Sequence, residues 1–589
     1  MDVELVSISC PILYQSINTT LIMAFNLIGR RHAPRQLILA RAKSTAAASS
    51  SSASACPFTG GSAEAKSPAP PELKHAPKLP IVGSLPFFPP DESDMYSYLN
   101  RRRKRYGEWY SFGAPGFSKD IYGTVFLMND PNEFVKVVRG EGTYPSGIVE
   151  YLWPIKAALK ECDSALVQTN ADGTTNYGLF DHGEQWKKQR MFLQTGMLDP
   201  RTAKGFIPGI SRAAELATAG APEMGREGKL NHYLNTAAFD MFSSFMLGEY
   251  TQAAAGRART DDNGNESTSN DENIRFCNAA IRFMEMSMAD IARSPYEMIM
   301  NKMGIKTAKW NEMIDHWKTV QEIGALKLDR FIEKRQRGEL NDVEKASYFA
   351  NALERYEAQP EGDEDDLTLD EVKQLCILSL FVSVDTTSTV TSWNLVHLAL
   401  NQDIQEKLYD EIATAVDSVG EGELTASVLE RSNTPYLTAF IRETNRLTPP
   451  FPSITSKSNS SKPIEIYGRE FPVGTNFVLE NIGNDERFIP DAKLFRPERW
   501  FSEEVESRKG TKQEHIDHVL ARDPFGQGAR RCPGSRVAAN EVLCMISQLV
   551  LKYKIQVSSP DIKSLEDIEK NWAPFIAPVI PKLDFVPRD

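Results

Sequence analysis

Apolar residues recur at helical spacing along most of the chain after residue 90, which predicts a mostly helical protein. The longest predicted helix begins at Thr368, where Glu371 completes a capping box, and runs without Gly or Pro to about Leu400. Its middle, LCILSLFVSV, is apolar on all sides, so we expect it to cross the core. A second helix is predicted soon after Cys532. Strand-like pieces are few, chiefly at 121–129 and 463–480.

Three polar or proline-rich stretches interrupt this pattern. The many prolines of residues 64–90 predict an extended segment before the domain that contributes little to a hydrophobic core. Residues 256–273 predict a mobile surface loop, and 358–366 a second, acidic loop before the long helix. The sequence shows no internal repeat.

The N-terminal 63 residues are expected to be a targeting segment. From Met23 to Ala63 there is no Asp or Glu, while Arg and Lys recur and a Ser/Ala-rich run follows, which is typical of a mitochondrial transit peptide. Met23 is then a candidate true start. The alternative is a membrane anchor at Leu5–Gly29, which carries no charge but is interrupted by polar residues, whereas a spanning helix needs about 20 mostly apolar residues.

Composition narrows the class of protein further. Of the 589 residues, 41% are hydrophobic, enough for a large core, and the net charge of −12 argues against nucleic acid as a general partner. The cysteines (Cys10, Cys56, Cys162, Cys277, Cys376, Cys532 and Cys544) are scattered, which disfavours both a disulfide framework and a zinc ribbon.

The stretch DPFGQGARRCPG is the most informative motif in the chain. Its glycines allow a close backbone approach, and Arg530 and Arg531 stabilise a thiolate on Cys532. A helix N-terminus just after the cysteine adds to that stabilisation. The alternatives are an ordinary buried thiol, or a zinc site with His515 and His518. A single cysteine ligand suits a metal that brings most of its own ligands, as haem does.

Three further constellations carry polar groups in unusual places. Asp385 and Thr386 lie inside the apolar long helix, where back-bonding to the preceding turn explains the hydroxyls but not the carboxylate. Glu443 and Arg446 lie one helical turn apart, with Arg499 downstream as a candidate third member of a buried network. Trp186 and Arg190, four residues apart, are donors suited to a carboxylate or propionate, although an ordinary amphipathic helix would show the same spacing.

Taken together, these motifs resemble the cytochrome P-450 family, the haem-thiolate monooxygenases, over roughly residues 78–589. The resemblance implies that this range forms a single domain. FGQGARRCPG fits the family's cysteine loop at every defined position, and WKKQR, DTT, ETNR and PERW occur in the family's order. The resemblance implies a mostly α fold with small β-sheets: a large helical domain whose long central helix lies over the haem, and a smaller β-containing region. It also implies haem b as the cofactor.

The resemblance assigns roles residue by residue. Cys532 would be the axial thiolate, in a loop that includes Phe525. Asp385 and Thr386 would deliver protons, and Glu443, Arg446 and Arg499 would form a structural triad. The haem propionates would be held by Trp186, Arg190, Arg530 and, in place of the usual Arg, Lys457, which acts only as a point charge.

One departure concerns the oxygen groove. The family usually has a small residue followed by Gly before x-Asp-Thr, whereas this chain has Val382 and Ser383. Val382 would narrow the kink that makes room for dioxygen. Either the groove is rebuilt nearby or the oxygen chemistry is unusual.

The reaction implied is insertion of one atom of O2 into a C–H bond of a lipophilic, sterol-like or related lipid substrate. With no convincing flavin or NAD fingerprint in the chain, electrons would come from a partner. EGTYPSGIVEYLWP and VDTTS resemble the mitochondrial branch, which uses an acidic ferredoxin and its reductase. This favours the matrix side of the inner mitochondrial membrane, with the endoplasmic reticulum membrane as the alternative, and peripheral membrane contact.

Candidate docking residues for the ferredoxin are Arg442 and Arg536, with Lys187 and Lys188 as weaker candidates that ordinary solvation would also explain. The branch usually carries a second basic residue one turn before Arg442, where this chain has Thr438. Two other functions remain open: a peroxygenase or isomerase that needs no external electrons, and a non-catalytic haem sensor or carrier. The Asp385–Thr386 pair argues against the carrier, because binding alone needs no proton relay.

Overall fold

The computed structural model describes residues 71–78, 84, 95–115, 122–145, 152–258, 271–359, 366–451, 453–458, 461–480, 482–571 and 575–588. The chain divides into two units, Met1–Pro68 and Ala69–Asp589. All described residues belong to the second unit. The predicted targeting segment 1–63 lies outside the described residues.

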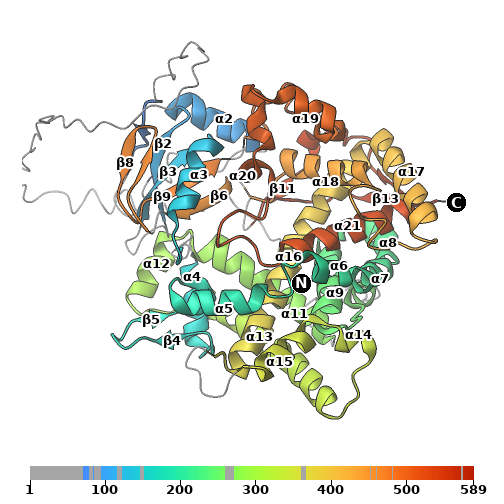
Figure 1. Cartoon of the computed structure of the whole chain (residues 1–589), viewed down its shortest axis with the longest axis horizontal. Coiled ribbons are helices and arrows are strands. Elements are labelled where there is room, and N and C mark those ends of the chain that lie inside the picture. The colour runs from blue at the N-terminus through green and yellow to red at the C-terminus, as the bar shows by residue number, and fades with distance from the viewer. Residues whose placement is uncertain are drawn as a thin grey trace, which may run out of the picture. The chain divides into compact units, whose positions relative to one another are not determined.

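Helices dominate the second unit, as the periodicity predicts (Figure 1). Their bounds are α2 Met95–Tyr106, α3 Pro131–Gly140, α4 Trp153–Glu161, α5 Glu184–Gln194, α6 Pro200–Gly205, α7 Ile207–Thr218, α8 Ala221–Glu227, α9 Leu230–Leu247, α10 Ala253–Ala258, α11 Glu272–Glu285, α12 Pro295–Lys302, α13 Ala308–Gln336, α14 Asp342–Lys345, α15 Tyr348–Glu357, α16 Leu369–Leu400, α17 Gln402–Val419, α18 Pro435–Leu447, α19 Ser502–Arg508, α20 Val519–Arg522 and α21 Ser535–Lys552.

The strands form one five-stranded sheet, in the order β1-β2-β3-β9-β6, and four two-stranded ribbons. Their bounds are β1 Lys74–His75, β2 Tyr110–Pro115, β3 Tyr122–Met128, β4 Gln168–Thr169, β5 Thr175–Asn176, β6 Ser453–Ser458, β7 Ile464–Ile466, β8 Arg469–Phe471, β9 Asn476–Glu480, β10 Tyr553–Val557, β11 Lys570–Asn571, β12 Ala577–Pro578 and β13 Leu583–Pro587. Both segments predicted to hold strands do so, with β3 in the first and β7, β8 and β9 in the second. The other strands lie outside the two predicted segments.

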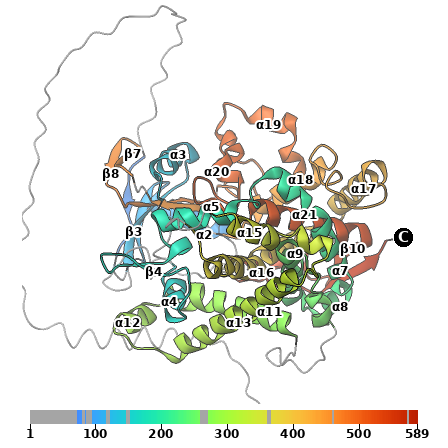
Figure 2. The same ribbon diagram turned by 60° about the horizontal axis from the view of Figure 1, so that its bottom comes forward.

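The five-stranded sheet joins distant parts of the sequence. β2 and β3 pair antiparallel, and β3 pairs in parallel with β9, with Val125 opposite Asn476. Figure 2 shows this β region to one side of the helices that surround α16. The predicted division into a large helical part and a smaller β part is therefore confirmed.

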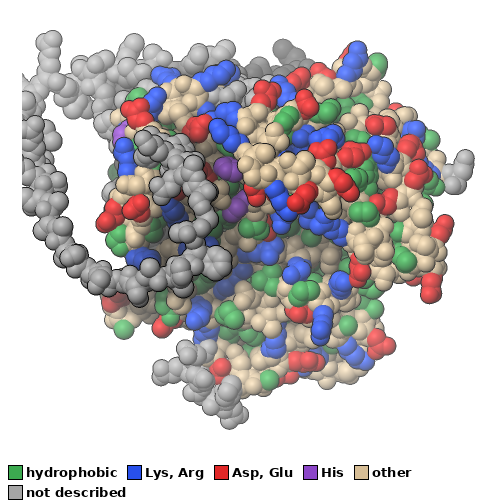
Figure 3. Space-filling model, turned by 45° about the horizontal axis from the view of Figure 1, so that its top comes forward, with side chains coloured by type: hydrophobic (Ala, Val, Ile, Leu, Met, Phe, Trp, Pro, Cys, Tyr) green, Lys and Arg blue, Asp and Glu red, His purple; other side chains and the backbone are tan. Residues whose placement is uncertain are grey.

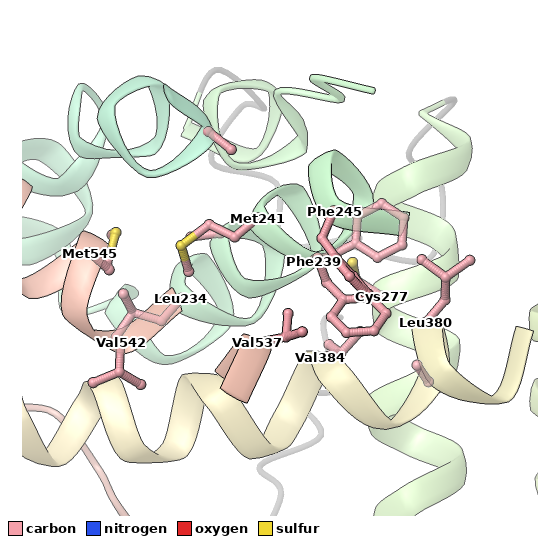
Figure 4. Close-up of a cluster of buried hydrophobic side chains, with 14 of the residues drawn as sticks. Leu234, Phe239, Met241, Phe245, Cys277, Leu380, Val384, Val537, Val542 and Met545 are labelled. Atoms are coloured by element: carbon pink, nitrogen blue, oxygen red, sulfur yellow. The ribbon is translucent and has the colours of Figure 1, made fainter. Parts of the chain in front are cut away.

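Helix α16 is the central element of the helical part. Its capping box forms as predicted: Glu371 N donates to Thr368 Oγ1 at 3.2 Å, and Thr368 N donates to Glu371 Oε2 at 2.9 Å. Leu380 and Val384 point toward Phe239 and Cys277 in the hydrophobic core (Figure 4). Helix α16 is long and apolar enough to cross a membrane, but 78% of its most apolar window is buried inside the protein, as expected of a core helix.

Two predictions about irregular segments need correction. The stretch predicted as a loop at 256–273 is partly helical, because α10 extends to Ala258 and α11 starts at Glu272, capped by the side chain of Asp271. The proline-rich lead-in does contribute to the core: β1 pairs in parallel with β2, and Ala76 is 3% exposed. Backbone pairing with β2 holds this segment against the sheet despite its proline-rich composition.

Candidate active site

The cysteine loop between α20 and α21 is held by one carboxylate and by its own backbone. Asp523 accepts a hydrogen bond from the backbone N of Phe525 at 3.0 Å and pairs with Arg531 at 3.1 Å. The backbone N of Cys532 donates to Phe525 O at 3.0 Å and closes the loop. Gly526 and Gly528 have φ of 73° and 83°, a left-handed conformation that side chains rarely adopt. The backbone path of the loop therefore requires glycine at both positions.

The thiol of Cys532 lies just before the N-terminus of α21. Burial raises its pKa above the ordinary value, while a hydrogen bond from the backbone of Gly534 and the charges of Arg190 and Arg531 lower it. The arginine pair beside the thiol is thus Arg190 and Arg531, not Arg530 and Arg531 as the sequence predicted. The pKa of the Cys532 thiol is therefore raised in the protein without cofactor, although both arginine charges act to lower it.

Two basic residues and an indole gather beside this loop. Trp186 and Arg190 are both buried on one face of α5, at 4% and 7% exposed. The Arg530 guanidinium lies 4.6 Å from the centre of the Trp186 ring, and its Nε donates to Pro145 O at 2.8 Å. Burial lowers the pKa of Arg530 to about 10.

Arg190 provides the test of whether an anionic cofactor fits. It donates to Arg531 O and to Gln194 Oε1, yet no carboxylate among the described residues pairs with it. A buried guanidinium without an anion is costly. The carboxylate of a bound propionate would supply that anion, so the residues beside Cys532 fit haem.

On the long helix, Asp385 and Thr386 are half-buried, whereas Val384 and Thr387 on either side of the pair are buried. Asn235 Nδ2 of α9 donates to Asp385 Oδ1 at 3.2 Å and to Ser388 Oγ at 2.9 Å. Burial raises the pKa of Asp385 to about 6 despite the Asn235 bond, and Glu285 adds to the shift. A carboxyl with this pKa both takes up and releases protons near neutral pH.

Back-bonding accounts for the hydroxyls of this stretch, as expected. Thr386 Oγ1 donates to Val382 O at 2.9 Å, and Ser383 Oγ donates to Leu380 O at 2.8 Å. Ser383 is only 6% exposed, whereas Val382 is 40% exposed. Helix α16 continues without a break through these positions. The oxygen groove is therefore not reopened by a helix interruption here.

A buried carboxyl that was not predicted from the sequence contacts α16 from α21. Glu541 of α21 is 1% exposed and accepts a hydrogen bond from Thr387 Oγ1 at 2.9 Å, while its Oε1 has no hydrogen-bond partner among the described residues. Burial raises its pKa to about 8. The one acidic residue in the apolar run VAANEVLC was the available signal.

The triad forms around Glu443 on α18. Arg446 Nε and Nη2 donate to its two carboxylate oxygens at 2.8 and 2.7 Å, and Arg499 Nε donates at 3.3 Å. The structure adds Trp500, whose indole N–H donates to Glu443 at 2.9 Å. These donors hold the pKa of Glu443 below its ordinary value against the opposing effect of burial.

The predicted docking residues differ in how available they are. Arg442 is half-buried, and burial followed by the charges of Arg431 and Arg522 lowers its pKa to about 10. Arg536 is exposed and donates to Leu198 O at 2.7 Å. Lys188 donates to Asp366 O at 2.6 Å, which ties α5 to the segment before α16, whereas Lys187 is exposed.

Phe525 and Lys457 were also predicted to contact the cofactor. Phe525 is half-buried in the cysteine loop, where its O accepts from Cys532 N. Lys457 lies on strand β6 opposite Phe477, but its side chain lies outside the described part of the structure.

Comparison with known proteins agrees with this arrangement. The sequence model of the cytochrome P450 family matches residues 73–576, so the chain belongs to the cytochrome P450 family. Members of this family bind haem through a cysteine thiolate. A structure of retinoic acid bound cyanobacterial CYP120A1 matches with a TM-score of 0.58 and 17% identity, covering 88% of this chain and all of the other, which shows the fold.

Individual relatives are similar at modest identity. Mitochondrial sterol 26-hydroxylase of Rattus norvegicus is 34% identical over 193 residues, 32% of this chain and 34% of that protein. Probable cytochrome P450 49a1 of Drosophila melanogaster is 24% identical over 493 residues, 82% of this chain and 77% of that protein. 2-Hydroxyisoflavanone synthase of Glycine max is 27% identical over 309 residues, 49% of this chain and 58% of that protein. The chain thus matches about a third of the first of these and over half of the others.

Proposed function

We propose that this protein is a haem-dependent monooxygenase that inserts one atom of O2 into a C–H bond of a lipophilic, sterol-like substrate. The observation that carries the proposal is the half-buried pair Asp385–Thr386 in the middle of the otherwise apolar α16. A sensor or carrier needs no carboxyl beside a hydroxyl at this position, because binding alone requires no proton relay. The names of the sterol 26-hydroxylases among the relatives support the substrate class.

In this proposal the protein binds and orients, and the cofactor supplies the oxygen chemistry. Bound haem with a thiolate ligand supplies an electron-rich iron that favours O–O cleavage. Cys532 is the residue that would ligate it, and Trp186, Arg190 and Arg530 would hold its propionates, with Lys457 as a further candidate. Asp385 takes up a proton from solvent and passes it on toward the hydroxyl of Thr386. Apolar residues around α16 exclude bulk water.

An isotope experiment tests the reaction. The haem-loaded protein is incubated under ¹⁸O2 with cholesterol or palmitic acid as probes, a ferredoxin, its reductase and NADPH. We expect a hydroxylated product with one ¹⁸O atom, formed only with reductant, and a drop of about 10²-fold in rate for Asp385→Asn. Product formed from peroxide alone would support the peroxygenase alternative. If no product forms with any electron donor or with peroxide, the result would support the non-catalytic haem sensor or carrier.

We also propose that an acidic ferredoxin delivers the electrons, at a cluster of three arginines. Arg431 and Arg522 are exposed and near enough to Arg442 to lower its pKa. Among the described residues, no carboxylate forms an ion pair with any of the three. Asp517, the one acidic group that acts on Arg442, pairs with Arg508 at 2.7 Å. Basic and acidic side chains are interspersed on the face in Figure 3, so a local cluster rather than a wholly basic face would select an acidic partner.

The mitochondrial location is proposed on the transit-like composition of residues 1–63 and on the mitochondrial relatives. Peripheral membrane contact is supported by three large apolar side chains on α12 and just after it. Tyr296, Met303 and Ile305 are 59%, 63% and 46% exposed. A surface of this kind lies in the interfacial region of a bilayer. Met303→Asp should weaken co-sedimentation with phosphatidylcholine–cardiolipin vesicles; unchanged binding would place the membrane contact elsewhere.

A further inference from the structure

One carboxylate at the start of α16 accepts hydrogen bonds from three glutamines, two of them on α5 and one on β4. Glu371 is 3% exposed. Its Oε1 accepts from Gln185 Nε2 at 2.8 Å, from Gln189 Nε2 at 3.3 Å and from Gln168 Nε2 at 3.4 Å. Its Oε2 serves the capping box and accepts from Thr368 N at 2.9 Å. Glu371 therefore does more than cap its own helix, because one of its two oxygens is occupied by donors from other elements.

The two glutamines of α5 fix the rotation of that helix about its own axis. Gln185 and Gln189 lie four residues apart and share one face of α5. Trp186 and Arg190 share the face that lies one residue further on, about 100° around the axis. A rotation of α5 that breaks the contacts to Glu371 would therefore also turn Trp186 and Arg190 away from the cysteine loop.

Gln189 extends the same constraint to Arg530. Its Oε1 accepts from the backbone N of Leu179 at 2.8 Å, in the short 3-10 helix that starts at Gly178. The side chain packs directly on this turn, because a Cβ added at Gly178 would overlap Gln189 Oε1. The turn ends at Asp181, whose backbone O accepts a hydrogen bond from Arg530 Nη2. The basic residues beside Cys532 that come from α5 and from the cysteine loop are thus linked to the same carboxylate.

We propose that Glu371 is a positioning residue for the cofactor, which holds α5 in the rotation at which Trp186 and Arg190 reach the haem propionates. It contacts neither the haem nor the substrate, and it acts through Gln185 and Gln189. This inference rests on the proposed function, because it requires a bound haem. The capping box is a separate role of the same side chain, so substitution can distinguish the two roles.

A reciprocal pair of variants separates these roles. Glu371→Gln keeps a residue type that completes a capping box, but it replaces one carboxylate oxygen by an N–H donor. Thr368→Ala removes the capping box and leaves Glu371 available to α5, so it is the matched control. Gln185→Ala removes the shortest of the three glutamine contacts at a half-buried site and provides a second variant that preserves the cap.

Two measurements on the haem-loaded protein report how the cofactor is held. Transfer of haem to an excess of apomyoglobin, followed by absorption, gives the rate of haem release. Resonance Raman bands of the propionates report the hydrogen bonds that these groups accept. We expect Glu371→Gln to release haem about tenfold faster than wild type, with shifted propionate bands, and Gln185→Ala to change in the same direction. Thr368→Ala should lower the midpoint of thermal unfolding and keep the wild-type release rate and bands.

Two results would overturn the role of Glu371. One is a wild-type release rate with wild-type propionate bands in both Glu371→Gln and Gln185→Ala. The other is a change in Thr368→Ala as large as that in Glu371→Gln, since it would reflect the stability of α16 alone. A wild type that takes up no haem, or haem that lacks thiolate ligation, would instead refute the proposed function.

Discussion

At the scale of single residues, two hydroxyls of α16 that bond back to the preceding turn differ in exposure, because Thr386 is half-buried and Ser383 is 6% exposed. Thr386→Ala should lower the amount of product per NADPH oxidised and release peroxide, because the group beside Asp385 that passes protons on is lost. Ser383→Ala is the control: Ser383 is buried and bonded to Leu380 O, so its coupling should match the wild type. Equal coupling in Thr386→Ala and wild type would show that the relay runs elsewhere.

The second residue-scale prediction concerns Glu541 and pH. Its pKa is about 8 in the folded protein and 4.5 ordinarily, so the folded state holds the extra proton between these values. The free energy of unfolding should therefore fall as pH rises from about 4.5 to about 8, by up to roughly 1.4 kcal/mol per pH unit from this group. Urea unfolding of the haem-loaded protein at pH 6 and pH 8 measures the fall. Glu541→Gln should show a smaller difference between the two; parallel losses in both proteins would mean that Glu541 is ionised throughout.

At the scale of elements, the triad fixes α18 to the segment that holds Arg499. Glu443→Gln leaves the buried charges of Arg446 and Arg499 without their anion, which should cost about 3–5 kcal/mol of unfolding free energy and lower haem retention. Glu430→Gln is the matched control, because the pair of Glu430 with Lys204 at 2.6 Å is exposed and should contribute less than about 1 kcal/mol. Equal losses in urea unfolding would show that the Glu443 network adds no more than a surface pair.

Elements specified by local sequence were predictable, and contacts between elements were mostly not. The Thr368–Glu371 capping box marks the start of α16, and the run without Gly or Pro after it predicts the length of the helix. The observed bounds, Leu369–Leu400, are therefore close to the prediction. Short strands such as β10 exist only because β13 pairs with them, and nothing local indicates that partner. The sequence offered Arg499 as a candidate partner of Glu443 and Arg446, and the family resemblance gave it the same role. Neither supplied Asn235 or Trp500, whose roles depend on helices and turns meeting in the fold.

The same limit explains the error at the cysteine loop. Sequence neighbours suggested that Arg530 and Arg531 stabilise the thiolate, but the loop turns Arg530 toward Trp186 and brings in Arg190 from α5. Charge next to a residue in sequence is a poor guide to charge next to it in space. Desolvation, which raises the pKa of Cys532, could not be judged before the fold was known.

At the scale of the whole molecule, the arginine cluster predicts how the protein meets its electron donor. Arg442→Glu should slow reduction by ferredoxin and weaken binding, mostly by lowering the association rate. The effect should be smaller at high salt, because salt at physiological strength already screens charges beyond a Debye length of about 8–10 Å. Because Arg442 is half-buried, the exposed pair Arg431→Glu/Arg522→Glu provides a second variant. Arg337→Glu, exposed at the end of α13, is the control. Affinities equal to wild type at low salt in both variants would remove the docking site.

The central claim is that Cys532 is the thiolate ligand of a haem, and the ferrous–CO absorption spectrum tests it most directly. The haem-loaded wild type, reduced and exposed to CO while folded, should show the red-shifted band of thiolate ligation. Cys532→His should retain some haem and lose that band together with product formation, while Cys544→Ala, which alters a buried cysteine on α21, should keep the band. A wild type without the red-shifted band, or a Cys532→His variant that retains it, would contradict the account.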